Sequence, residues 1–127
     1  MRILIFTQYF WPENFRINDL VQELSNRGHK ITVITGLPNY PSGNLHSEYK
    51  KKPTKFSNYC SAKIIRVPIV LRGNGNLLRL FFNYVSYVLS ASIGAWRLRK
   101  SEFDLAFVYE PSPITVCLPA IFFKFLT

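Results

Sequence analysis

The sequence predicts an α/β protein built on an open, Rossmann-like parallel sheet with helices on both faces. Short apolar and β-branched runs alternate with segments in which apolar residues recur at helical spacing, a pattern typical of βαβ units. The connection after the first apolar run, residues 8–16, is rich in aromatic and polar side chains, as is typical of a ligand-binding loop at the carboxyl end of a parallel strand. The 127 residues fit one domain with one core, and we expect the usual strand order for such a beginning, 3-2-1-4.

The first βαβ unit is predicted in residues 2–35. Residues 2–7 are expected to form a buried strand because they contain an unbroken apolar run. A helix follows, in which apolar residues recur at helical spacing up to Gly28, a residue that suits a left-handed helix cap. Residues 30–35 are β-branched and predict a second strand, joined to the first by a right-handed crossover.

The rest of the chain predicts two more strands. Residues 36–62 have no periodicity and are interrupted by prolines and glycines, which indicates a long loop of the kind that is usually functional or mobile. Strands are expected at 63–67 and 104–109, with a glycine-rich turn at 73–76 between them. The fourth strand would be an apolar edge with no fifth strand to cover it, so the sheet is expected to be incomplete at its C-terminal side.

Residues 77–99 form the longest predicted helix. Their polar side chains share one narrow stripe, which argues against a simple transmembrane span. The stripe comprises Arg79, Asn83, Ser86, Ser90 and Arg97. Two interpretations remain open: a helix buried against the sheet by most of its circumference, which we prefer, or one that also dips into a bilayer surface with its C-terminal cations at the headgroups.

The formal net charge of +9 is unevenly distributed. Between His46 and Arg72, seven lysine and arginine residues face a single acid, Glu48. Such a patch attracts anionic lipid headgroups, phosphorylated substrates or nucleic acid, although a solvated loop is the alternative. No nucleic-acid-binding motif accompanies the charge, so nucleic acid is not an expected partner. The predicted membrane and anion patch comprises Lys50, Lys51, Lys52, Lys55, Arg97, Arg99 and Lys100.

A ligand crevice is predicted where residues 8–14 meet residues 109–113. In the expected order the first and fourth strands are neighbours whose connections diverge to opposite faces, and ligands bind at such a point. The crevice is expected to include Phe10, Trp11, Glu13, Asn14, Arg16, Asn39, Tyr40, Tyr109 and Ser112.

Alternatives remain for three parts of this crevice. Phe10 and Trp11 could instead plug the top of the sheet, and Glu13 and Arg16 could form an ion pair at a helix start. Glu110 is the candidate catalytic residue, because a lone carboxylate at a strand end can accept hydrogen bonds from sugar hydroxyls or transfer a proton. Its alternative role is a charge stabilised by the dipole of the helix predicted to begin nearby.

Other site classes are not predicted. The two cysteines, Cys60 and Cys117, are far apart and lack metal-ligand spacing, so neither a disulfide framework nor a metal site is expected. The glycine-rich dinucleotide and phosphate-loop motifs, Gly-x-Ser-x-Gly and His-Glu-x-x-His do not occur. The apolar stretch after the first two residues is too short for a cleavable signal, so we expect a cytoplasmic location.

Three segments together resemble family 4 glycosyltransferases, particularly bacterial enzymes of lipopolysaccharide, colanic-acid and capsule assembly. They are residues 8–16 (QYFWPENFR), 26–41 (NRGHKITVITGLPNYP) and 108–113 (VYEPSP). The resemblance implies a fold of two Rossmann-like domains and retaining transfer of a sugar from a nucleotide-sugar to an acceptor, without a metal. The N-terminal domain would face the acceptor, often a lipid-linked saccharide at the inner face of the cytoplasmic membrane. The nucleotide-sugar is a co-substrate, bound mainly by the other domain, and no resident cofactor is expected.

The chain departs from the family pattern in two ways. Many relatives have a histidine where this chain has Tyr109, whose phenol, with an ordinary pKa near 10, is a poor base but a good hydrogen-bond donor. No segment corresponds to the nucleotide-sugar domain, so we expect a partial N-terminal domain that is inactive alone, either truncated or one half of a split transferase. The alternative function is a non-catalytic subunit that recruits such a transferase to the membrane or acts as its scaffold.

Overall fold

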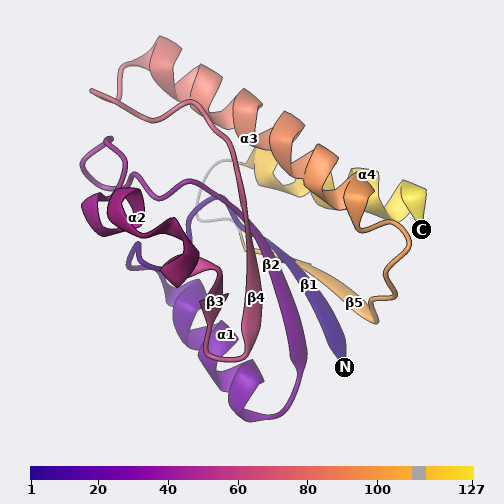
Figure 1. Cartoon of the computed structure of the whole chain (residues 1–127). Helices are drawn as coiled ribbons and strands as arrows, with labels where there is room; N and C mark the ends of the chain where they lie inside the picture. Colours follow the sequence, from indigo (N-terminus) through magenta and orange to yellow (C-terminus); the bar gives the residue numbers. More distant parts are fainter. Residues whose placement is uncertain (110–113) are drawn as a thin grey trace.

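A five-stranded mixed sheet forms the centre of the computed structural model, which describes residues 1–109 and 114–127. Its strands are β1 (Arg2–Phe6), β2 (Lys30–Gly36), β3 (Asn58–Tyr59), β4 (Ala62–Val67) and β5 (Leu105–Val108), in the spatial order β3-β4-β2-β1-β5 (Figure 1). The pairs β4–β2, β2–β1 and β1–β5 are parallel, whereas β3 runs antiparallel to β4. The α/β class is therefore confirmed.

The expected strand order, 3-2-1-4, is not matched, because the sequence interpretation missed β3. This strand of two residues turns back onto β4, so that Asn58 pairs with Lys63 and Tyr59 with Ala62. Cys60 makes the tight turn between them with a φ of 53°. A strand this short has no alternation to detect, and it makes the sheet mixed rather than wholly parallel.

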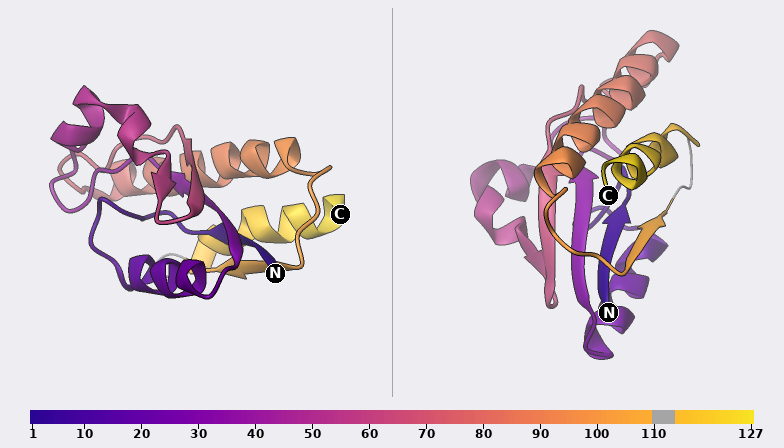
Figure 2. Two further views of the ribbon diagram at one scale, coloured as in Figure 1. Left: turned by 60° about the horizontal axis from the view of Figure 1, so that its bottom comes forward. Right: turned by 90° about the vertical axis from the view of Figure 1, so that its right-hand side faces the viewer.

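Helices cover both faces of the sheet (Figure 2). Helix α1 (Arg16–Asn26) covers one face, and α3 (Leu77–Arg97) and α4 (Cys117–Leu126) lie side by side on the other. The alternation of β1 supplies both cores, because successive side chains of a strand point to opposite faces. Ile3 and Ile5 pack in the cluster that contains α1, and Leu4 and Phe6 pack in the cluster that contains α3 and α4.

The long excursion after β2 is partly helical. It contains α2 (Ser47–Lys51) and the short 3₁₀ helix η1 (Pro53–Phe56). The buried side chain of Phe56 anchors this segment to the rest of the protein. A second 3₁₀ helix, η2 (Ile114–Val116), precedes α4. The expectation of a loop without regular structure over residues 36–62 is therefore wrong, since these turns are too short to show periodicity in the sequence.

Helix α3 is buried along one stripe only. Its buried residues are Asn83, Tyr87, Ala91, Gly94 and Ala95, and much of its remaining apolar surface is exposed. The preferred interpretation, burial by most of the circumference, is therefore wrong. The reason is that part of the polar stripe faces the protein, so the apolar remainder of the helix faces outward.

Strand β5 forms the edge of the sheet beside β1. It pairs with β1 among the described residues, and its apolar side chains Leu105 and Phe107 are exposed. The main apolar contacts of this region come instead from Val108 and Phe103, which pack against the core under α3 and α4.

Candidate functional site

The candidate site lies at the carboxyl edge of the sheet, where β1 and β5 end side by side. Phe6 pairs with Val108, and the Tyr109 amide donates a hydrogen bond to the Phe6 carbonyl at 3.0 Å. From β1 the chain continues to α1 on one face, whereas η2 and α4, beyond β5, lie on the opposite face. This divergence is the arrangement at which open α/β sheets bind ligands. Two predicted site residues, Glu110 and Ser112, lie outside the described residues.

Glu13 joins the loop after β1 to the loop after β2. Its carboxyl group is buried, with the residue only 2% exposed. One carboxyl oxygen accepts a hydrogen bond from the Phe10 amide at 3.2 Å. The other accepts from the amides of Asn39 at 3.1 Å and Tyr40 at 2.8 Å. The expectation that Glu13 lines the crevice is wrong, and so is its alternative as the partner of Arg16, because its carboxyl group already serves three buried backbone donors.

The carboxyl group of Glu13 is poised between its two protonation states near neutral pH. Burial raises its pKa to about 7, although the three backbone donors and the nearby Arg66 guanidinium act in the opposite direction. Burial also lowers the pKa of Arg66 to about 10. Arg66 donates hydrogen bonds to the carbonyls of Trp11 and, at 3.3 Å, Gly36. Glu13 and Arg66 thus each join the loop after β1 to the chain at or just beyond the end of β2.

Phe10 and Trp11 act mainly as packing residues. Phe10 is fully buried and makes an edge-to-face contact with Tyr59, with ring centroids 5.5 Å apart. Trp11 is half-buried, with its ring 4.8 Å from Phe56 and 5.2 Å from Tyr59. The prediction that Phe10 lines the crevice is therefore wrong, and the alternative, a plug over the top of the sheet, describes it correctly. Trp11 keeps a partly exposed edge.

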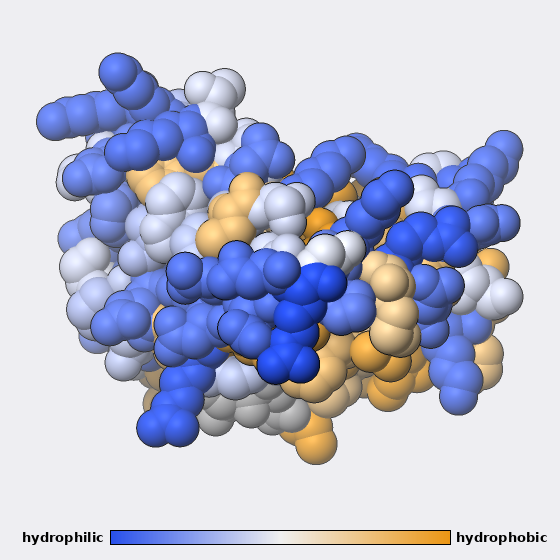
Figure 3. Space-filling view, turned by 90° about the horizontal axis from the view of Figure 1, so that it is seen from below, coloured by the Kyte–Doolittle hydropathy of each residue, from blue (hydrophilic) through white to orange (hydrophobic). Residues whose placement is uncertain are grey.

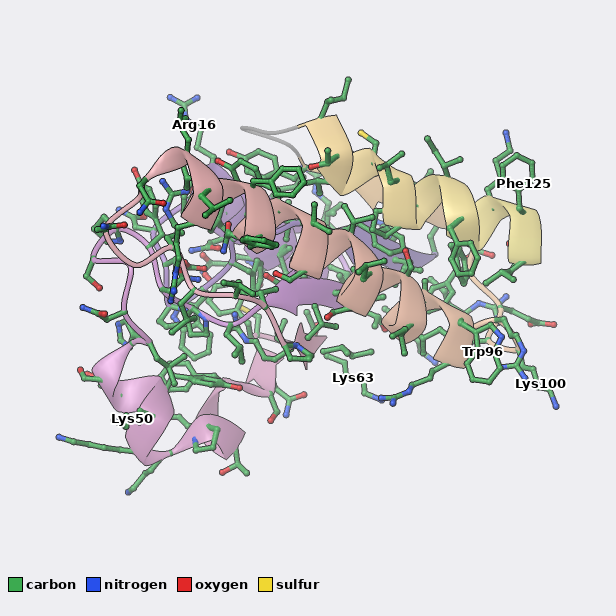
Figure 4. The ribbon with its side chains drawn as sticks, turned by 90° about the horizontal axis from the view of Figure 1, so that it is seen from above. Arg16, Lys50, Lys63, Trp96, Lys100 and Phe125 are labelled. Carbon is green, nitrogen blue, oxygen red and sulfur yellow. The ribbon has the colours of Figure 1, made fainter. Side chains whose placement is uncertain are left out.

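Three predicted site residues are placed where a ligand could reach them. Asn14 and Arg16 are exposed, and Arg16 points away from the protein into solvent (Figure 4). Tyr109 is half-buried against the α1 core. Asn39, by contrast, is buried and fixes the loops, since its side-chain amide donates to the Leu37 carbonyl and its oxygen accepts from the Arg72 amide.

An aromatic cluster with one guanidinium, which the sequence interpretation did not assemble, lies beside these residues. Tyr9 stacks on Phe15 at 5.2 Å, and Tyr40 lies 5.1 Å from Phe15. The Arg72 guanidinium lies 5.3 Å from the Tyr40 ring and donates to the Tyr9 hydroxyl at 2.5 Å. Tyr40 remains 41% exposed, so its ring face and the Arg72 cation are presented together.

This arrangement has a recognisable chemical capacity. An exposed aromatic face can stack on a sugar ring, and a guanidinium held by aromatic rings can bind a phosphate or carboxylate substituent. The signal that could have found Arg72 is its position in the loop that follows the third long strand, because the carboxyl ends of parallel strands meet at one edge. Its aromatic partners come from the loops after the other two strands.

The amino edge of the sheet carries a separate cavity of about 640 Å³. It is lined by basic residues that include His29, Lys30 and Lys63. Arg2 in its wall is neutralised by Glu102 at 2.7 Å and Asp104 at 3.6 Å. We assign the candidate site to the carboxyl edge rather than to this cavity. At that edge the loops after the strands meet, and the connections after β1 and β5 lead to opposite faces of the sheet. Within residues 1–109 and 114–127, no three His, Cys, Asp or Glu side chains gather in a way that could hold a metal ion.

The predicted anion patch is divided between two ends of the molecule. Lys50 projects from α2, whereas Lys100 follows α3 at the far end of that helix (Figure 4). Lys55 is partly compensated by Glu48 at 3.7 Å. The two groups of cations therefore cannot bind one small anion together.

Comparison with known proteins adds no assignment. A scan against models of protein families matches none of them, and a search of curated proteins finds no match. The function proposed below therefore depends on the motifs in the sequence and on the geometry of the carboxyl edge.

Proposed function

We propose that this chain is the acceptor-binding, N-terminal part of a retaining glycosyltransferase. It would act in surface-polysaccharide biosynthesis, where a sugar moves from a nucleotide-sugar to a lipid-linked saccharide. The observation that carries the proposal is the junction made by Glu13. It ties residues 8–16 to residues 39–40, and both stretches belong to the segments that resemble family 4 glycosyltransferases.

The residues of the carboxyl edge suit a saccharide acceptor. Tyr40 offers an aromatic face for stacking, and Asn14 and Tyr109 can exchange hydrogen bonds with sugar hydroxyls. Arg72 offers a cation for a phosphate group, which a lipid-linked saccharide carries between sugar and lipid. We propose Glu110 as the residue that contacts the acceptor or the transferring sugar.

The donor site belongs to a second domain in this proposal. That domain, in the same or a separate chain, would hold the nucleotide-sugar as a co-substrate. Catalysis of this type depends on positioning both reactants, so we expect residues 1–127 alone to show negligible transfer.

The proposed location is peripheral, on the inner face of the cytoplasmic membrane. The cationic group at the end of α3 would favour anionic lipids there, and the group at α2 is the other candidate for that contact. The outward-facing apolar residues of α3 also support a second candidate, a non-catalytic subunit that recruits or scaffolds a transferase at the membrane.

Acceptor binding provides the test. We would titrate the chain with water-soluble, short-prenyl pyrophosphate saccharides and measure binding by ligand-observed NMR. Tyr40→Ala and Arg72→Ala should each weaken binding by about tenfold, which is about 1.4 kcal/mol. Lys30→Ala, at the opposite edge, is the matched control and should bind like the wild type. Equal binding by all four proteins, or binding by none, would remove the acceptor-site assignment and leave the recruiting subunit as the better description.

A further inference from the structure

We infer that the outward faces of α3 and α4 form one docking surface for an anionic lipid bilayer, on which both helices lie in the plane of the membrane. This α3–α4 face is defined by Phe81, Leu89, Ile93 and Trp96 of α3 and by Phe122 and Phe125 of α4. This surface would make the membrane contact of the peripheral location in the proposed function. It rests on that part of the proposal and not on transferase activity.

The α3–α4 face is apolar and exposed to an unusual degree. Leu89 is 62% exposed and Phe125 84% exposed, although both belong to regular helices. A groove of about 440 Å³ between the helices is lined by Leu89, Ser92, Ile93, Trp96 and Phe122. A single exposed leucine is ordinary on a soluble protein, but a contiguous apolar surface along two neighbouring helices marks an interaction site.

Helix α3 is held along the sheet by its opposite stripe. By length and composition it could cross a membrane. However, the Asn83 side chain accepts from Gln8 Nε2 and donates to the Val70 carbonyl, both at 2.6 Å. The buried Tyr87 hydroxyl donates to the Ile34 carbonyl at 3.1 Å. Insertion across the bilayer would break these bonds, whereas docking flat on its surface keeps all of them.

The charge beside the α3–α4 face favours lipid over a protein partner. Neither 77–97 nor 117–126 contains an acidic residue. Arg97, Arg99 and Lys100 lie at the end of α3. Figure 4 shows Trp96, Lys100 and Phe125 at the same end of the helix pair. Cations beside an apolar surface complement a bilayer with anionic headgroups.

Trp96 and Arg99 add the geometry typical of a membrane interface. The Arg99 guanidinium lies 3.9 Å from the centroid of the Trp96 ring and donates to the Trp96 carbonyl at 3.0 Å. An indole ring with a cation above it suits the headgroup layer, where one side of the pair is wet and the other apolar. The docked depth should therefore place Trp96 near the headgroups and Leu89 among the acyl chains.

The same orientation brings the candidate site to the membrane. The loop that carries Arg72 leads directly into α3, and the Arg79 side chain donates back to the Leu71 carbonyl at 2.7 Å. Arg72 thus lies beside the N-terminal end of the α3–α4 face. The phosphate of a lipid-linked saccharide could therefore reach Arg72 while its lipid stays in the bilayer.

The experiment uses Trp96 as its own reporter. The chain contains two tryptophans, so Trp11→Phe leaves Trp96 alone and keeps an aromatic ring against Phe56. We would add vesicles of phosphatidylcholine with about one third phosphatidylglycerol, a composition that gives a negative surface potential. The expected result is a shift of Trp96 emission to shorter wavelength and quenching by lipids brominated on the acyl chains.

Variants on exposed positions separate the contributions. Leu89→Asp and Phe125→Asp should each reduce co-sedimentation with these vesicles by about tenfold or more, because each places a charge in the apolar layer. Leu20→Asp, on α1, is the matched control and should bind like the wild type. Arg97→Gln with Lys100→Gln should reduce binding by about 20-fold and abolish most of its salt dependence, whereas Lys50→Gln with Lys51→Gln should change it little.

Three outcomes would overturn the inference. The first is vesicle binding that Leu89→Asp and Phe125→Asp do not reduce. The second is Trp96 emission that does not change on binding. The third is a stable dimer in analytical ultracentrifugation that these two variants dissociate, with no vesicle binding, which would make a second copy the occupant. Binding of soluble acceptor by Tyr40 and Arg72 is measured without vesicles, so failure of the docking surface and failure of the proposed function are distinguishable.

Discussion

The two faces of the sheet are covered by helices that differ in how completely they are amphipathic. On the α1 face, Ile17 and Val21 pack inward against Ile3 and Ile5, and most of the outward residues of the helix are polar or charged. On the other face, Tyr87 and its buried neighbours pack inward equally well, but the outward residues are apolar. Figure 3, seen from below, shows that hydrophilic side chains cover much of the lower end of the molecule, away from α3.

Burial of the sheet does not explain the composition of α3. A helix needs only one apolar stripe to cover a sheet, and α1 shows that this chain builds such a helix elsewhere. A second apolar stripe on α3 has no role in the fold, so it calls for a partner outside it.

The largest expected effect is on the inner stripe of α3. Tyr87→Ala should lower the free energy of unfolding by about 3–5 kcal/mol, since it opens a cavity and leaves the Ile34 carbonyl without its side-chain donor. Leu89→Ala, two residues along on the outer stripe, should change it by no more than about 0.5 kcal/mol. Urea unfolding measures both values. Similar losses for the two variants would show that the outer stripe of α3 also stabilises the fold.

The next effect concerns the loops on the α1 side and depends on pH. The pKa of Glu13 in the folded protein, about 7, is above its ordinary value of 4.5, so the folded state binds more protons between these two values. The stability of the wild type should therefore fall as pH rises from about 4.5 to 7, by at most about 3 kcal/mol relative to Glu13→Gln. Thermal unfolding of both proteins across this range gives the difference. A difference that is constant with pH, or that changes with the opposite sign, would contradict the burial of a charged carboxylate.

A smaller effect is expected where α3 is tied to the loops. Asn83→Ala should cost about 1–3 kcal/mol, because the buried Gln8 Nε2 loses its acceptor and the part-buried Val70 carbonyl loses a donor. Ser90→Ala, a polar residue of the same helix that is only half-buried, is the control and should be nearly neutral. Hydrogen exchange of the first half of α3 should rise in the first variant and not in the second.

The smallest effect concerns the backbone conformation at the C-terminal ends of α1 and α3. Gly28, beyond the end of α1, has a φ of +82° and nothing within 4 Å of an added Cβ, so Gly28→Ala should cost roughly 1–2 kcal/mol through the backbone alone. Leu98, the C-cap of α3, has a φ of −91°, and Leu98→Ala therefore carries no such backbone penalty. Gly28→Asn, which tolerates the left-handed conformation better, should recover part of the loss. Full stability of Gly28→Ala would show that α1 ends differently in solution.

The sequence was sufficient for the long elements and poor for the short ones. The strands expected at 2–7, 30–35, 63–67 and 104–109 are found at nearly the same residues, because each has an apolar or β-branched run and a turn at its end. Strand β3 and helices α2 and η1 were missed because each is too short for its periodic pattern to repeat. The predicted strand order was wrong for the same reason, because it lacked β3 at one edge of the sheet.

The site was predicted at the correct kind of place but with the wrong roles for several residues. Phe10 and Glu13 have the residue types of a binding loop, and both are buried for structural reasons. Whether an aromatic ring or a carboxylate in a loop faces a ligand or the core depends on the backbone around it, which periodicity does not describe. Arg72, by contrast, was not predicted as a site residue but lies at the candidate site. Its aromatic partners come from two loops far away in the sequence.

Local periodicity and composition are enough to predict the α/β class, the apolar strands and the charge imbalance. Which surface of α3 faces outward follows only from the packing of this helix on the sheet. The inner stripe is held by the Asn83 side chain, which accepts from Gln8 Nε2 and donates to the Val70 carbonyl, two groups that lie far from it in the sequence. A helical wheel of 77–97 contains both stripes, but long-range polar bonds and the shape of the sheet choose between them.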